Sequence, residues 1–168
     1  MRLADAIDEL FECSLAAIDP PVCRSFKNPG EGAPHDNCEK NKSTGADGQL
    51  WVAHLGSTSG WPSPTGEPTV CSTPFSEHIE IGITRCVLSK LTDQGKPPSE
   101  ELITADFEQQ EADRLAIRNA MLCCAAIEGK DVIIEGWEPI DPQGGCVGGV
   151  WTLYVRDAGC DCNNIESS

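Results

Sequence analysis

Hydrophobic residues recur at three- and four-residue spacing along residues 1–18, which is typical of an amphipathic helix. We expect the apolar side of this helix to face the protein core, although a partner-binding surface is the alternative. The segment Asp19-Pro20-Pro21 then ends the helix, because proline cannot continue it. The apolar stripe consists of Leu3, Ile7, Leu10, Phe11, Leu15 and Ile18.

Two segments alternate between apolar and polar residues, as β-strands with one buried face do. Residues 49–55 place Leu50 and Val52 on one face and Trp51 on the other. Residues 76–89 form the clearest strand, with Ile79, Ile81, Ile83 and Val87 alternating with more polar positions.

Arg85 falls in register with the apolar face of that second strand. It can cap the end of the face, pair with an acid or contact a neighbouring subunit. A satisfied salt bridge is the simplest of these interpretations, because an unpaired charge is costly to bury.

Helical spacing returns over residues 99–128, with Ser99 or Thr104 as the possible start and Gly129 as the stop. Acidic residues fill the first half, where they suit the helix dipole. We interpret them as a solvated face and not as catalytic groups. The predicted buried stripe consists of Ala116, Ala120, Cys123 and Ile127, beside Ile117, Met121 and Cys124.

Residues 131–156 contain two β-rich segments around a turn-rich centre, and they predict an antiparallel hairpin with a long, kinked connection. A phosphate-binding loop is a weaker interpretation. The segment lacks the Lys-Ser/Thr pair of such a loop, and a strand follows where a helix should begin. The centre contains Pro139, Pro142, Gly144, Gly145, Gly148 and Gly149.

Residues 19–47 and 56–74 have no apolar period and are rich in Gly and Pro, so we expect two long loops there. Loops held by a scaffold often carry contacts. Trp61 is our preferred anchor for a partner, with packing against its own core as the alternative. The candidate interface residues are Trp61, Arg85, Gly144, Gly145, Gly148 and Gly149.

The order of elements is helix, strand, strand, helix, strand, strand. Because strands and helices do not alternate one by one, this order favours an α+β fold. We expect a four-stranded, mainly antiparallel sheet with two helices packed on one face and long loops. Residues 1–156 form a single domain in this interpretation, and residues 157–168 form a polar C-terminal tail.

A formal net charge of −15 argues against a surface that binds duplex DNA or an anionic membrane. No apolar run approaches the ~20 residues needed to span a bilayer. The acids near the N-terminus argue against a secretory signal. Acidity is compatible with simple solubility, or with a wall past which nucleic acid moves without sticking.

Ten cysteines are an unusually large number, but they contain no C-x-x-C pair, and the three histidines show no ligand spacing. We therefore expect no metal, no cofactor and no catalytic constellation, and hence no enzyme. Reduced, buried cysteines are the default. Cys23, Cys38 and Cys71 lie in loop-like surroundings and are the better disulfide candidates.

Several segments together resemble small neck proteins of actinobacterial long-tailed phages, most closely the tail terminators. The resemblance covers residues 1–156, and its most specific part is the GGC-x-GG-x-W segment. It is carried by the N-terminal helix, GQLWV (48–52), EIGITRC (80–86), the helix with Cys123-Cys124, and WEPIDPQGGCVGGVWTLYV (137–155).

The resemblance implies a structural virion protein without catalysis. Tail terminators form hexameric rings that stop growth of the tail tube and present a surface to the head connector. The implied partners are other copies of the chain, the tail tube protein and the connector or stopper. Genomic DNA passes through the ring without specific binding. A head-completion stopper on the portal side of the neck is the alternative.

Overall fold

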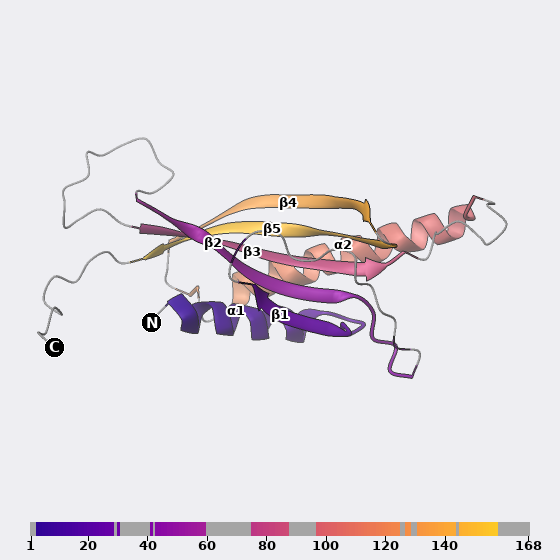
Figure 1. Cartoon of the computed structure of the whole chain (residues 1–168), viewed down its shortest axis with the longest axis horizontal. Helices are drawn as coiled ribbons and strands as arrows, with labels where there is room; N and C mark the ends of the chain where they lie inside the picture. Colours follow the sequence, from indigo (N-terminus) through magenta and orange to yellow (C-terminus); the bar gives the residue numbers. More distant parts are fainter. Residues whose placement is uncertain are drawn as a thin grey trace, which may run out of the picture.

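A computed structural model describes most of the chain, and its elements form one sheet with two helices (Figure 1). The described residues are 3–28, 30, 41, 43–59, 75–87, 97–124, 127–128, 131–143 and 145–157.

The chain forms two helices and five strands, so the predicted α+β class is confirmed. In chain order they are α1 (Leu3–Ala17), β1 (Arg24–Asn28), β2 (Gln49–Ser59), β3 (Phe75–Cys86), α2 (Glu100–Cys123), β4 (Val132–Gln143) and β5 (Cys146–Asp157).

The sheet has the order β1-β2-β3-β5-β4, in which β1 runs parallel to β2 and all other neighbours are antiparallel. The prediction of four strands was wrong because β1 lies within the expected loop 19–47. This strand is short and polar, and its clearest apolar residue, Phe26, pairs with Trp51 of β2. The two rings stack with their centroids 6.4 Å apart. Residues 24–28 therefore form a strand because they pair with β2, and not because their own sequence alternates between apolar and polar residues.

Both helices pack on the same face of the sheet. Leu10 of α1 and Ile117 of α2 share one buried cluster with Leu50, Ile81 and other residues of the central strands. The predicted core-facing stripe of α1 and the alternation in β2 and β3 are thus confirmed. A second, smaller cluster around Trp51 lies on the opposite face, since Trp51 points away from Leu50 in the same strand.

Strand β2 runs through Ser59, so the expected loop 56–74 begins later than predicted. The remainder of that segment, with Trp61, lies outside the described residues.

Helix α2 begins after Ser99, whose hydroxyl accepts a hydrogen bond from the Leu102 amide at 3.4 Å. It ends at Cys123, earlier than expected, and Gly129 lies outside the described residues. Ile117 and Met121 are buried as predicted, whereas Cys123 is exposed. The buried side of α2 also includes Asp106 and Asp113. Our prediction, which followed the spacing of apolar residues, placed these two acids on the solvated face.

Strands β4 and β5 continue through the turn-rich centre, so the predicted long connection was wrong. Gly145, with a φ of 82°, lies in the short turn between them. Pro139 and Pro142 fall in β4, which is an edge strand and tolerates proline. Gly148 and Gly149 lie in β5, where a Cβ would stand 1.9 Å from the Ile83 carbonyl oxygen and 2.4 Å from the Trp137 ring, respectively.

A disulfide joins Cys13 of α1 to Cys124 at the end of α2, so the prediction of reduced cysteines was wrong for this pair. Their Cα atoms are 6.0 Å apart although 111 positions separate them in sequence. Packing of α1 against α2 creates this proximity. Cys23, a preferred candidate, is free, and Cys38 and Cys71 lie outside the described residues.

The Gly82→Ala substitution tests the close packing of the sheet. A Cβ at Gly82 would lie 2.1 Å from the Trp51 ring. Trp51 is fully buried, so its ring has no free space into which it could shift. We expect a loss of about 1–3 kcal/mol in the free energy of unfolding, measured by denaturant titration. Gly136→Ala in β4 is the matched control, because nothing lies within 4 Å of its Cβ position. Equal stability of the two variants would contradict the packing argument.

Candidate functional site

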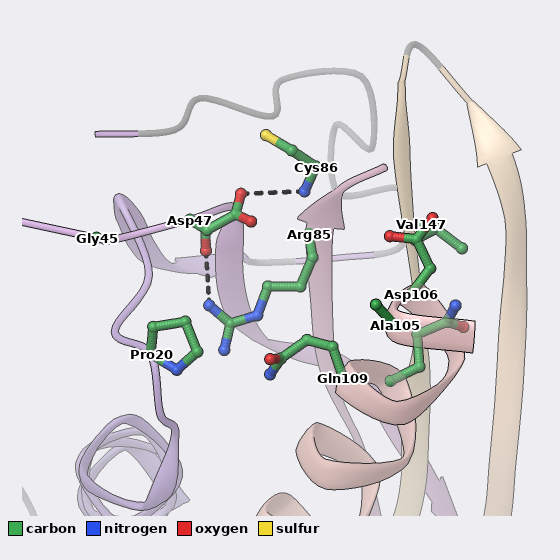
Figure 2. Close-up of a pocket in the computed structure, with 10 residues that line it drawn as sticks. Pro20, Gly45, Asp47, Arg85, Cys86, Ala105, Asp106, Gln109 and Val147 are labelled. Atoms are coloured by element: carbon green, nitrogen blue, oxygen red, sulfur yellow. Dashed lines mark hydrogen bonds between the residues drawn. The ribbon is translucent and has the colours of Figure 1, made fainter. Parts of the chain in front are cut away.

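A pocket of about 210 Å³ opens where the end of β3 meets the first half of α2 (Figure 2). The connection after α1, the residues before β2 and the start of β5 complete its wall. The lining residues are Pro20, Gly45, Asp47, Arg85, Cys86, Ala105, Asp106, Gln109, Gln110 and Val147.

Arg85 is the central charged group of this pocket, and it is only 2% exposed. Its Nε and Nη2 donate to the two carboxylate oxygens of Asp113 at 2.9 and 2.8 Å. Its Nη1 donates to the Asp47 carbonyl at 2.8 Å (Figure 2). The predicted salt bridge of Arg85 is therefore confirmed, and its acid comes from α2.

The neighbours of Arg85 extend this network to the rest of the pocket. The Asp47 carboxylate accepts from the Cys86 amide at 3.1 Å, and the Asp47 amide donates to the Pro21 carbonyl at 2.9 Å. Gln109 donates to the Asp19 carbonyl and to Asp113, each at 3.3 Å. The network thus connects α2, β3 and the segments before β1 and β2.

This arrangement is suited to holding elements together. The guanidinium of Arg85 is already neutralised by Asp113, while Asp47 and Asp106 add further negative charge to the wall. The pocket therefore disfavours a phosphate or carboxylate ligand.

A second polar cluster joins β2 to β3. His54 Nε2 lies 2.8 Å from Glu77 Oε2, and the Ser57 hydroxyl donates to the same oxygen at 2.5 Å. The bulge after His54 brings Glu77 opposite Ser57, so both side chains reach one carboxylate. In a serine hydrolase the serine would donate to the histidine. Here both groups meet the carboxylate instead, which favours a structural role.

The structure brings part of the predicted interface set together, because Arg85 of β3 pairs with Val147, which lies between Gly145 and Gly148 in the hairpin. Arg85, Gly148 and Gly149 are buried, and Gly145 is exposed in the hairpin turn. Trp61 and Gly144 lie outside the described residues. Contacts of these positions with other subunits stay a prediction.

The surface that our sequence interpretation missed is the outer side of α2. Within the described chain, the large hydrophobic side chains that are exposed all belong to this helix. Phe107 is 63% and Leu122 62% exposed. The spacing of Ile103 and Phe107 could have indicated this surface, but the acids between them favoured a purely solvated face. The exposed set is Leu102, Ile103, Phe107, Leu115 and Leu122.

Across the described ranges, no group of three or more His, Cys, Asp or Glu side chains is placed to hold a metal ion. In the same part of the chain, no helix has the length and apolar character needed to cross a membrane.

No protein-family model matches the chain, and no curated protein matches it.

The buried ion pair can be tested by Arg85→Met. This change leaves the Asp113 carboxylate buried without its partner, and we expect it to lower the free energy of unfolding by about 3–5 kcal/mol. Arg156→Met is the matched control, since the Arg156–Asp131 pair is exposed and should contribute below about 1 kcal/mol. Denaturant titration of both variants measures the difference, and similar small losses would refute a central role for Arg85.

A pH titration can test the surface pair Glu111–Arg114. Hydrogen bonds from Arg114, opposed by desolvation and aided by charge attraction, hold the pKa of Glu111 below its ordinary value. The stability that this pair contributes should be present above the unfolded-state pKa and lost as pH falls through the lower folded-state pKa. We expect the NMR titration midpoint of Glu111 to rise in Arg114→Gln. An unchanged midpoint would show that Arg114 is not the cause.

Proposed function

We propose that this chain is a structural subunit of the neck of a long-tailed phage. In this proposal, copies form a ring, with six as the expected number, that ends the tail tube and joins it to the head connector. The supporting resemblance rests on segments that form the centre of the fold. GQLWV and EIGITRC lie in or beside the paired strands β2 and β3, and GGC-x-GG-x-W spans the turn into β5.

The observation that carries the proposal is the exposed apolar side of α2. Monomeric proteins rarely expose large contiguous apolar patches, and such patches commonly bind another protein. Phe107 and Ile103 are more than half exposed although other side chains of the same helix are fully buried. A chain that must assemble with copies of itself requires such a surface.

The charge of the chain fits the proposed passage of DNA. With a net charge of −15, an acidic ring wall would repel phosphates and let DNA slide without binding. The Arg85 guanidinium adds no free positive charge, because it is already paired with Asp113.

Deletion of the gene from a phage that encodes this chain tests the proposed role. We expect tails of irregular and excessive length that do not join to filled heads, as seen by electron microscopy. Complementation with the intact gene is the control. Heads that lose their DNA, with tails of normal length, would favour the stopper alternative. Normal particles would contradict both roles.

A further inference from the structure

We propose that α2 of one copy docks on the helix-free face of the sheet, next to β1, of the neighbouring copy. This inference rests on the proposed ring, and it identifies the two surfaces that would form the contact between neighbouring copies. The partner is a second copy of the same chain.

The first surface, the helix patch, consists of Glu100, Ile103, Phe107 and Glu111. Spacing of three and four residues places these four on one side of α2. Ile103 is 51% and Phe107 63% exposed, so the patch has an apolar centre between two acids. The first turns of α2 reach past the ends of the strands (Figure 1), which leaves this patch accessible to another molecule.

The second surface, the strand patch, consists of Arg24, Phe26 and Leu55. Phe26 and Leu55 are partly buried and pack around Trp51 in the smaller cluster. This cluster lies on the sheet face away from α1 and α2. All of its described members belong to strands, and none belongs to a helix. The guanidinium carbon of the exposed Arg24 lies 5.9 Å from the centre of the Phe26 ring. The patch therefore combines an aromatic ring with an exposed cation, while Glu80 beside it accepts a hydrogen bond from the Trp51 indole at 2.8 Å.

Charge complementarity selects this pairing. Arg24 supplies the positive charge of the strand patch, whereas Lys27 of the same strand points to the helix side and pairs with Asp8 of α1. On the helix patch Glu111 pairs with Arg114, so the exposed Glu100 is the acid that complements Arg24. An acidic surface with an apolar centre fits best against the basic, aromatic strand patch.

The other free surface of the sheet is less suited to assembly. Edge strand β4 contains Pro139 and Pro142, and its pairing with β5 is interrupted between Ile134 and Gly136. Prolines, bulges and charges at an edge act against strand addition.

The positions of the two patches predict the symmetry. The helix patch belongs to the helix layer and the strand patch to the opposite face of the sheet. One pair of copies therefore cannot use both contacts at once, and each copy has a neighbour on either side. Such a heterologous contact forms a ring when its rotation closes.

The test compares self-association of purified full-length variants by analytical ultracentrifugation. We expect Phe107→Ser and Arg24→Glu each to weaken association by about tenfold or more. Leu122→Ser is the matched control, because Leu122 is equally exposed on the same helix but outside the patch, and it should assemble like the wild type. Circular dichroism verifies that each variant is folded.

A mixing experiment gives the sharper result. Phe107→Ser retains its strand patch and Arg24→Glu retains its helix patch. Together they should form a one-to-one dimer that cannot grow, whereas each alone stays monomeric. The reversal Glu100→Arg combined with Arg24→Glu should recover association.

The possible failures are distinguishable. If the wild type forms rings that Phe107→Ser and Arg24→Glu leave intact, this interface is wrong and the neck function stands. If assembly depends on both patches but gene deletion leaves particles normal, the interface stands and the neck function is wrong. A wild-type chain that stays monomeric at all concentrations overturns the interface.

Discussion

Burial of the Arg85 guanidinium is the constraint on which the arrangement of this protein depends. A buried charge is tolerated only when its hydrogen-bonding groups find partners, and here those partners come from α2 and from the segment before β2. Asp113 must therefore face the sheet, which fixes the rotation of α2. The rotation in turn decides which side chains of α2 enter the core and which stay outside.

Close contacts between tryptophan rings and glycines determine how side chains pack on neighbouring strands of the sheet. Trp51 lies over Gly82, and Trp137 lies over Gly149, so neighbouring strands approach without a side chain between them. Trp151 also donates a hydrogen bond from its indole nitrogen to the Arg114 carbonyl at 3.0 Å. This bond attaches the middle of α2 to β5 and acts together with the Arg85 pair.

These constraints explain why the candidate surface lies on α2. Leu122 lies on the side of α2 that faces away from Ile117. The first turns of α2, which contain Ile103 and Phe107, reach past the ends of the strands and are therefore not covered by the sheet (Figure 1). Apolar exposure on the helix thus follows from both the rotation and the length of α2, and the proposed assembly would use it. Function in the proposed ring would follow from shape and charge rather than from a reactive group.

The sequence by itself determined the elements whose apolar period is strong. These are the first helix, the alternation of Leu50 and Val52 in β2, the Ile79–Ile83 strand, and the two strands around the glycine-rich turn. It also predicted an ion pair for Arg85, because a charge in register with an apolar face requires a partner. Only the tertiary structure decided that this partner is Asp113, that β1 pairs with β2, and that Cys13 meets Cys124. The physical reason is that periodicity reports which side of an element is buried, whereas partners distant in sequence are selected by packing in three dimensions.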